Sequence, residues 1–310
     1  MAPQVFHQWR DLPPEAKGAA VAFGNFDGVH LGHQGVIRQA AEAAYRLGAP
    51  LGVVTLEPHP QRLFHPDSPP SRLMNLRQLG RALAELGVEQ LHLLPFGHQM
   101  ANLSAHAFVE DILVHGLGVR HVAVGFDVTF GNNRTGDPQV MRRCGEAFGF
   151  SVSVTEEIDG PDGAKISSTA IRDALRDGDP VGAAKLLGRP FAIEGVVEKG
   201  QQLGRKLGIP TANVSLGEYV TPRLGVYATR TRLKDGRHLG GVANIGVNPT
   251  TGVVAARLEV FIFNFDEDIY GEVIETELIE FIRPEEKFDS IEDMLAVIRG
   301  DVVKAREILG

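Results

Sequence analysis

A short polar turn between an apolar run and an amphipathic stretch constrains the fold of this chain more than any other feature. The turn reads G-N-F-D-G-V-H-L-G-H over 24–33, directly after the apolar run 21–23. The stretch to about Arg46 has helical spacing, and a second apolar run, 51–56, follows it. The order strand, tight turn, helix, strand predicts the start of a βαβ series and hence a parallel sheet.

The turn carries two histidines, His30 and His33, one helical turn apart where the helix is expected to start. A helix N-terminus has unpaired N–H groups and the positive end of the helix dipole, so phosphate binds there readily. The imidazoles add donors, and Gly32 between them allows a ligand to approach the backbone closely. The alternative is a helix start with two surface histidines. Because a strand precedes the turn and Asp27 lies in it, we favour a nucleotide site.

Other phosphate and metal motifs are missing from the sequence. No G-x-G-x-x-G follows a strand and no Gly-Lys dipeptide occurs, which excludes a dinucleotide fingerprint and a Walker A loop. H-E-x-x-H is also absent, and His59 and His65 lie in Pro-rich loops, so a zinc site is not expected. If ATP binds here, a helix terminus and side chains must hold its phosphates.

Length and composition narrow the class of protein. A chain of 310 residues has room for about two domains, and 43% hydrophobic with 23% charged residues is typical of a globular protein. The net charge of −8 and the absence of a basic block argue against a nucleic-acid partner. No run approaches the roughly twenty apolar residues of a membrane span. The polar N-terminus and a single cysteine, Cys144, which we expect to be buried, predict a cytoplasmic protein.

The two halves of the chain differ in pattern. Short apolar runs alternate with amphipathic stretches up to about Leu187, which extends the βαβ series. The expected helices are 72–86, 105–115 and 138–148, and the expected strands are 91–94, 121–124 and 152–154. In such sheets ligands bind beyond the carboxyl ends of the strands, which is where the turn at 25–32 lies.

After Gly188, alternating and β-branched runs punctuated by Gly and Pro predict an all-β barrel or sandwich. We therefore expect domains at 1–186 and 187–310. A terminal helix is expected after Ser290, which forms a capping-box pattern with Asp293. The stripe that we expect this helix to bury in the core consists of Ile291, Leu295, Ile298 and Val302.

A second polar motif, I-S-S-T-A-I-R over 166–172, follows a loop rich in Gly and Asp. Ser or Thr before a helix is an N-cap, which is the simpler interpretation. The functional interpretation is that Ser167, Ser168 and Arg172 hold a triphosphate from the side opposite the histidines, since Arg172 lies one turn into the helix.

Several motifs in this order resemble bacterial bifunctional riboflavin kinase/FMN adenylyltransferases (FAD synthetases). In the first half they are the histidine turn, V-V-T-L-E-P-H-P (53–60), V-G-F-D-V-T-F-G-N-N-R (124–134) and I-S-S-T-A-I-R. In the second half L-G-I-P-T-A-N (207–213), G-V-Y (225–227), N-I-G-V-N-P-T (244–250) and L-E-V (258–260) are similar to the kinase module. The resemblance implies a Rossmann-like nucleotidylyltransferase domain at 1–186 and a riboflavin kinase-like barrel at 187–310.

For the second half, the resemblance implies that riboflavin is phosphorylated by ATP to FMN. Glu259 would be the base, and Thr211 and Asn213 would lie at the Mg²⁺–phosphate centre, with Gly208 and Pro210 beside them. Hydroxyl and amide oxygens are hard ligands that suit Mg²⁺, and Pro210 fixes its φ angle just before them.

For the first half, the resemblance implies that the FMN phosphate attacks the α-phosphate of a second ATP, giving FAD and pyrophosphate. His30 and His33 would hold the α- and β-phosphates. The other ATP contacts would be Asn25, Asp27, Asp127, Arg134, Ser167, Ser168 and Arg172. The nucleophile is already an anion, so the protein's task is alignment and charge stabilisation.

Three residues depart from the family pattern: Val128 stands where an aromatic residue is usual, and Phe261 and Asn264 stand where His and Asp are common. The segment 250–257 also lacks the Phe that usually follows Pro-Thr. Two alternatives therefore stay open. One is an enzyme with a single activity, which would be the kinase if Val128 has damaged the adenylylating site. The other is a flavin-binding regulator on the same scaffold, although no basic recognition segment supports it.

Overall fold

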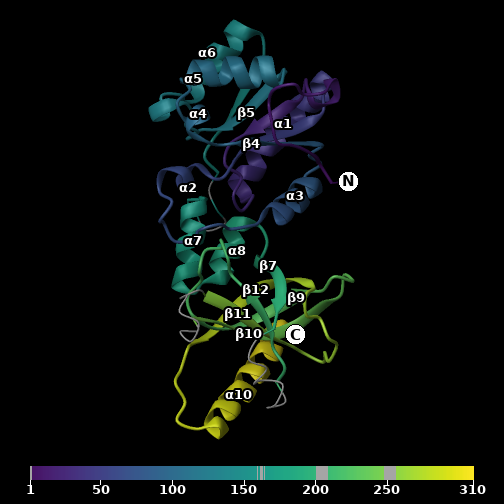
Figure 1. The fold of residues 1–310 in the computed structure, drawn as a ribbon, viewed down its shortest axis with the longest axis vertical. Coiled ribbons are helices and arrows are strands. Elements are labelled where there is room, and N and C mark those ends of the chain that lie inside the picture. Colours follow the sequence, from purple (N-terminus) through teal and green to yellow (C-terminus); the bar gives the residue numbers. More distant parts are fainter. Residues whose placement is uncertain (1, 159, 161–162, 164, 200–208, 248–255) are drawn as a thin grey trace. The chain divides into compact units, whose positions relative to one another are not determined.

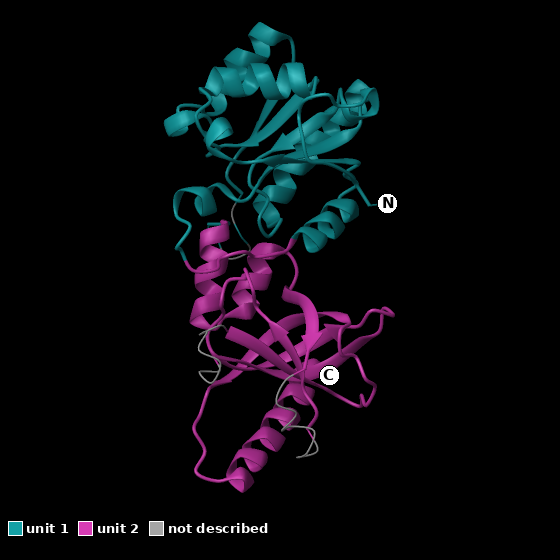
Figure 2. Cartoon of the chain, viewed as in Figure 1, with its two compact units in different colours: residues 1–68, 76–166 teal, residues 69–75, 167–310 magenta. Residues whose placement is uncertain are grey.

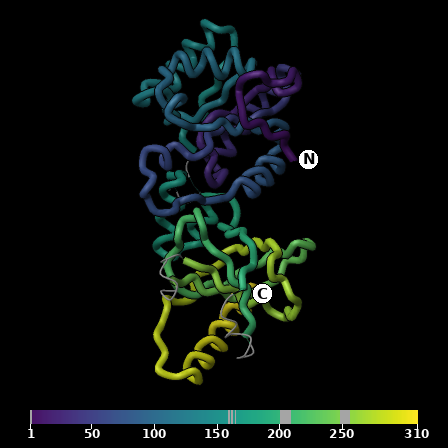
Figure 3. The backbone as a smooth tube through the Cα atoms, viewed as in Figure 1, coloured from purple at the N-terminus to yellow at the C-terminus, as the bar shows by residue number. Residues whose placement is uncertain are grey.

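The computed structural model describes residues 2–158, 160, 163, 165–199, 209–247 and 256–310 (Figure 1). These residues form two compact units, coloured separately in Figure 2: unit 1 comprises 1–68 and 76–166, and unit 2 comprises 69–75 and 167–310. The tube in Figure 3 follows the chain from one unit into the other and back. No helix in these described ranges is both long and apolar enough to cross a membrane.

Unit 1 is built around a six-stranded sheet in the order β1-β4-β3-β2-β5-β6, and every neighbouring pair is parallel. The strands are β1 (Gln4–Phe6), β2 (Ala20–Phe23), β3 (Leu51–Glu57), β4 (Gln90–Pro95), β5 (His121–Gly125) and β6 (Ser151–Thr155). The helices are η1 (Pro14–Ala16), α1 (Leu31–Leu47), α2 (Pro60–Phe64), α3 (Leu76–Glu85), α4 (His98–Ala101), α5 (Ala105–Ala107), η2 (Phe108–Gly116), η3 (Asn132–Arg134) and α6 (Pro138–Phe148). The parallel α/β fold expected from the sequence is confirmed.

The strand order of unit 1 reverses at β2. From β2 the chain proceeds outward through β3 and β4, and then returns to place β5 on the other side of β2. In open α/β sheets ligands bind beyond the carboxyl ends of the strands at such a switch point. The turn at 24–30 follows β2 and the loop at 126–134 follows β5, so both lie at the edge of the sheet where a ligand is expected.

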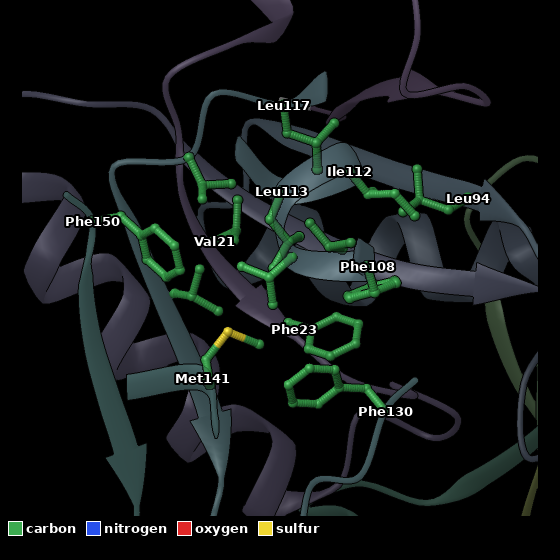
Figure 4. Packing of buried hydrophobic residues seen from close by; sticks show 14 of the residues in the cluster. Val21, Phe23, Leu94, Phe108, Ile112, Leu113, Leu117, Phe130, Met141 and Phe150 are labelled. Atoms are coloured by element: carbon green, nitrogen blue, oxygen red, sulfur yellow. The ribbon is translucent and has the colours of Figure 1, made fainter. Parts of the chain in front are cut away.

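An aromatic cluster in the core of unit 1 anchors both of these loops. The rings of Phe23, Phe108 and Phe130 lie within 5.2 to 5.9 Å of one another, centroid to centroid (Figure 4). Phe23 is the last residue of β2, and Phe130 lies in the loop after β5 and is 6% exposed. Aromatic pairs of this kind contribute about 0.5–1.5 kcal/mol beyond the area that they bury. The core therefore positions the two loops that follow β2 and β5.

The helix expected over 72–86 is only partly correct, because the helix α3 covers just its second part. Arg72 instead forms a parallel bridge with Tyr219, and its N–H donates to the carbonyl of Glu218. Segment 69–75 thus belongs to unit 2. The helical spacing of the leucines could not show this. A residue is apolar whether it is buried in a helix or in an extended segment that pairs with a distant part of the chain.

The helix expected over 105–115 is confirmed, but most of it is not an α-helix. Only α5 is α-helical there, and η2 is a π-helix of nine residues. Gly116 ends it against the N-terminal segment, because a Cβ at Gly116 would lie 2.6 Å from the carbonyl oxygen of Trp9. Hydrophobic spacing does not distinguish i→i+5 from i→i+4 hydrogen bonding over two turns.

Unit 2 contains a closed barrel in the order β10-β11-β8-β7-β12-β9. Its strands are β7 (Phe191–Glu198), β8 (Ala212–Ser215), β9 (Gly225–Arg232), β10 (His238–Val247), β11 (Ala256–Ile262) and β12 (Val273–Pro284). All pairs are antiparallel, which resolves the expected barrel or sandwich in favour of a barrel. Unit 2 also contains α7 (Ser168–Asp177), α8 (Pro180–Leu187) and α10 (Ile291–Leu309).

The terminal helix α10 is capped as expected: the Ser290 hydroxyl oxygen accepts the N–H of Asp293 at 3.1 Å. Its second half packs on the barrel, where Val302 and Ala305 join a cluster with Val242 and Phe263. The first half does not follow the expectation, because Ile291 is 54% exposed. The apolar stripe is therefore core packing at its C-terminal end and open at its N-terminal end.

Candidate active sites

The turn after β2 is held in an unusual backbone conformation. Val29 has φ of 40°, in the left-handed region that β-branched residues seldom adopt. Its N–H donates to the carbonyl of Phe26, and its own carbonyl accepts from the Gln34 side chain at 3.0 Å. Strain of this kind persists only where the surroundings enforce it, and it concentrates at functional sites.

His30 caps the helix α1 with its own ring. Its Nδ1 accepts the backbone N–H of His33 at 3.3 Å, and the ring is buried. An accepting Nδ1 carries no proton, so in the neutral ring the proton resides on Nε2, which becomes the donor. The structure thus fixes the tautomer that can present an N–H to a phosphate oxygen.

The two imidazoles are stacked, with ring centroids 3.5 Å apart and an angle of 18° between the planes. Gly32 allows this, because a Cβ there would lie 3.2 Å from His30 Cε1 and Nδ1. Phe26 meets the ring of His33 edge-on at 5.2 Å. The pair predicted from the sequence is therefore one assembled feature rather than two separate surface side chains.

The loop after β5 brings Asp127 and Arg134 to the neighbouring strand end, and both side chains are exposed. The loop is closed by reciprocal backbone hydrogen bonds between Phe130 and Gly136. Arg134 has φ of 57°, so the chain is tightly turned where its side chain leaves the loop. Asn25 and Asp27, on the turn after β2, lie at the same edge of the sheet.

Lys165 also lies beside this loop, with its ammonium 5.9 Å from the ring centroid of Phe126 and 3.5 Å from the Glu157 carboxylate. The sequence analysis did not single out this lysine. A lone lysine carries no motif, and only the contact with Phe126 reveals that it lies next to the residue that follows β5.

The I-S-S-T-A-I-R motif caps the helix α7. Ser167 is the N-cap, and its hydroxyl oxygen accepts the N–H of Ala170 at 3.1 Å. The helix begins at Ser168. Arg172 donates from Nε to the carbonyl of Ser71 at 2.6 Å, which ties α7 to segment 69–75. These residues belong to unit 2, whereas both histidines belong to unit 1.

On the barrel, strand register aligns three polar residues. Glu259 of β11 is directly opposite Asn213 of β8 on one side and Asn244 of β10 on the other. Residues directly opposite each other in antiparallel strands share a face. Leu258 and Val260 are fully buried in the barrel, so Glu259 and the two asparagines lie on its outer face.

Burial raises the pKa of Glu259, and the carboxylate of Glu285 adds to this, while Arg257 opposes it. Asn244 donates from Nδ2 to Glu285 at 3.1 Å. Gly246 makes room for this pair, because a Cβ there would collide with Glu285. The sequence motif 244–250 begins at Asn244 but gives this residue no role, and Glu285 lies in no motif. Strand pairing places Asn244 opposite Glu259, and Asn244 in turn holds Glu285.

A pocket of about 280 Å³ opens beside this row of residues. Pro210, Thr211 and Asn213 line it together with the loop 265–270, so Asn213 belongs both to the pocket and to the row that includes Glu259. Gly208 lies outside the described residues. Within the described ranges, no three His, Cys, Asp or Glu side chains gather as a metal-binding set.

The three departures from the family pattern have structural roles. Val128 packs against the core of unit 1, and Phe261 packs with Phe263 against the cluster under α10. Asn264 accepts a hydrogen bond from Arg306 of α10 at 3.4 Å. Phe261 and Asn264 therefore belong to the surface of the barrel on which α10 packs.

Comparison with known proteins matches two family models to this chain. The FAD synthetase model covers residues 12–170, and the riboflavin kinase model covers residues 187–309. Together the two matches span most of both units.

Similar proteins extend over nearly the whole chain. A bifunctional riboflavin kinase/FMN adenylyltransferase of Pseudomonas fluorescens is 42% identical over 306 residues, which is 98% of this chain and 97% of that protein. Proteins of the same description from Escherichia coli K12 and Bacillus subtilis are 40% and 36% identical, and cover 98% and 97% of this chain and 96% of each relative. A crystal structure titled as a macrolide-efflux protein from Streptococcus pneumoniae has a TM-score of 0.86 at 32% identity and covers 97% of each chain.

Proposed function

The chain belongs to the bifunctional riboflavin kinase/FMN adenylyltransferases, and we propose that Glu259 and the His30–His33 pair are the centres of its two reactions. The first reaction converts riboflavin to FMN and the second converts FMN to FAD, each with ATP as a substrate. We assign the second to residues 1–186 and the first to residues 187–310. One observation carries the proposal: each unit holds its own assembled polar site, the stacked histidines in unit 1 and the Asn213–Glu259–Asn244 row in unit 2.

In the adenylylation step, an oxygen of the FMN phosphate attacks the α-phosphate of ATP and pyrophosphate leaves. His30 donates from Nε2, and His33 beside it donates to the same phosphates, so the charge that develops on their oxygens meets fixed donors. Arg134 and Asp127 contact the nucleotide from the loop after β5, and Asn25 and Asp27 from the turn after β2.

We also propose that Ser167, Ser168 and Arg172, at the start of α7 in unit 2, contact ATP. The Ser167 hydroxyl accepts a backbone N–H, which leaves its own proton for an acceptor such as a phosphate oxygen. Arg172 donates from Nε to the Ser71 carbonyl, and a planar guanidinium suits a phosphate group.

In the kinase step, the 5′-hydroxyl of riboflavin attacks the γ-phosphate of the ATP that occupies the 280 Å³ pocket. Glu259 accepts the hydroxyl proton, and its raised pKa makes it a stronger base than an ordinary carboxylate. Asn213 lies between the pocket and Glu259, so the phosphate end of the nucleotide is directed toward the base.

The oxygens near the pocket fit Mg²⁺. Thr211 and Asn213 offer hard neutral oxygens, and Asn213 directs its Nδ2 toward the Thr211 carbonyl at 3.5 Å, which leaves its amide oxygen to face a cation. Because these protein ligands are neutral, the negative charge that balances Mg²⁺ would come from the phosphates of the nucleotide. Bound there, Mg²⁺ would neutralise charge on the β- and γ-phosphate oxygens.

We propose that the flavin ring lies against the open half of the stripe on α10. Leu309 of α10 lies against Gly240, and Val302 packs against the cluster that includes Val242, which is consistent with a helix antiparallel to β10. At 1.5 Å per helical residue and 3.3 Å per strand residue, its preceding turns, with Leu295 and Ile298, extend toward the Asn244 end of the strand. These half-exposed side chains supply an apolar surface for the ring.

A purified preparation incubated with riboflavin, ATP and Mg²⁺ tests the proposal when the flavins are separated over time. We expect FMN to rise first and then give way to FAD. Accumulation of FMN without FAD, also when FMN is supplied directly, would remove the adenylyltransferase assignment. No conversion of riboflavin would remove the kinase assignment.

We further propose a cytoplasmic location, where riboflavin and ATP are both supplied and the lone thiol, Cys144, stays reduced and buried.

A further inference from the structure

One wall of the 280 Å³ pocket is a loop rather than a strand. Six consecutive residues, 265–270, line the pocket between the strands β11 and β12. The loop is anchored by backbone hydrogen bonds at both ends. Phe263 donates to the Gly240 carbonyl before it, and Gly271 donates to the Val197 carbonyl after it. The middle of the loop is the part that a ligand would meet.

The turn between β9 and β10 contacts the middle of this loop through one arginine. Arg237, in the turn between β9 and β10, donates from Nη1 and Nη2 to the two carboxylate oxygens of Glu267, at 2.7 and 2.9 Å. Its guanidinium also lies 5.7 Å from the ring centroid of Phe265. Both Glu267 and Phe265 line the pocket.

Arg237 is itself fixed before it reaches the loop. The Asp235 carboxylate accepts from the backbone N–H of Arg237 at 3.0 Å and from its Nε at 2.7 Å. A planar guanidinium held at three of its nitrogens has a single orientation, whereas an isolated exposed ion pair is worth little because both side chains remain free to rotate.

The negative charge of the loop is a second reason for the Arg237–Glu267 ion pair. Asp266, Glu267 and Asp268 are consecutive carboxylates on the pocket wall, and the pocket is proposed to receive a polyanionic nucleotide. The fork of Arg237 neutralises the central one and lowers the pKa of Glu267 through its hydrogen bonds. Without it, the loop would repel both itself and the ligand.

We propose that Arg237 is a positioning residue of the kinase, which holds the loop 264–272 as the closed wall of the nucleotide pocket. This inference rests on the proposed placement of the kinase ATP in that pocket. Arg237 does not line the pocket, so its effect passes through Glu267 and Phe265. The expected signature is a change in the KM for ATP with little change in kcat.

The test compares Arg237→Ala with wild type in both reactions of the full chain. We expect the KM for ATP in riboflavin phosphorylation to rise about 3- to 10-fold, the magnitude of a charge-assisted bidentate contact at a partly exposed site. FMN adenylylation by the same preparation, at an independent ATP site, should keep its KM for ATP. Lys234→Ala, a neighbouring exposed cation in the same turn, is the matched control and should change neither.

Two more variants make the outcome decisive. Arg237→Lys keeps the charge without the fork and should give an intermediate KM. If Arg237 acts through Glu267, the double variant Arg237→Ala/Glu267→Gln should be no worse than the more impaired single variant. An unchanged KM for ATP in Arg237→Ala, or additive effects in the double variant, would overturn the inference. The proposed function would still stand in that case if the wild type phosphorylates riboflavin.

Discussion

The imidazole of His30 lies flat over that of His33, centroid to centroid 3.5 Å, while its Nδ1 accepts the His33 backbone N–H. One residue is thus both the cap of a helix and half of the pair that we propose binds phosphate.

Substitution of the histidines separates their two roles. His33→Ala should slow FMN adenylylation about 10²- to 10³-fold, as expected when a donor to developing charge is lost. His30→Asn retains an N-cap acceptor and should leave the thermal unfolding temperature close to wild type, while adenylylation falls. His30→Ala should in addition lose about 1 kcal/mol of stability. FAD formation at the wild-type rate in His33→Ala would contradict the assignment.

Glu259→Gln should affect only the other reaction. The amide keeps the size of the side chain but cannot accept the hydroxyl proton, so riboflavin phosphorylation should fall about 10²- to 10⁴-fold. FMN supplied directly should still become FAD at the wild-type rate. The measurement is flavin separation with each substrate in turn, and Glu280→Gln, which replaces an exposed carboxylate of β12, serves as the control. Retained kinase activity in Glu259→Gln would identify a different base.

Two buried histidines make the stability of unit 1 depend on pH. Burial lowers the pKa of His92 and His121 to about 4, from the ordinary 6.5, and Arg46 contributes at His121. Between these values the unfolded chain binds more protons than the folded chain, so the free energy of unfolding falls as pH falls from 6.5 toward 4. Each histidine accounts for at most about 3 kcal/mol of this loss.

Denaturant unfolding of wild type and His92→Phe at pH 7 and pH 5 checks this dependence. A phenyl ring suits the site because Phe6 stacks on His92 at 5.2 Å. The variant should lose less stability than wild type between the two pH values. His115→Gln, at an exposed position, should behave as wild type. An equal loss in wild type and His92→Phe would show that His92 is not the responsible group.

Phe130→Ala should impair unit 1 in two ways. Removing a buried aromatic side chain costs about 3–5 kcal/mol. It also releases the loop that bears Arg134 from Phe23 and Phe108, so adenylylation at temperatures where unit 1 remains folded should show a higher KM for ATP. Calorimetry and steady-state kinetics measure the two effects. Phe130→Leu, which refills most of the volume, should recover most of the stability, and a normal KM in Phe130→Ala would separate the core from the site.

Much of the fold follows from local sequence patterns. The caps Ser167 and Ser290 can be predicted from the sequence, because a capping side chain bonds to an N–H only three residues away. The parallel sheet of unit 1 follows from alternating apolar runs and amphipathic stretches. The histidine pair is local as well, since one helical turn determines its separation.

What the sequence left undetermined depends on pairing between distant segments. Asn244 reaches Glu259 only because β10 and β11 pair in one register, and a shift of one residue would turn Asn244 to the other face. Arg237 reaches Glu267, thirty residues away, only when the barrel closes. Segment 69–75 belongs to unit 2, although its apolar residues have helical spacing, because the backbone of Arg72 pairs with Tyr219 and Glu218. Local patterns determined the elements and their caps, and long-range backbone pairing decided which side chains meet.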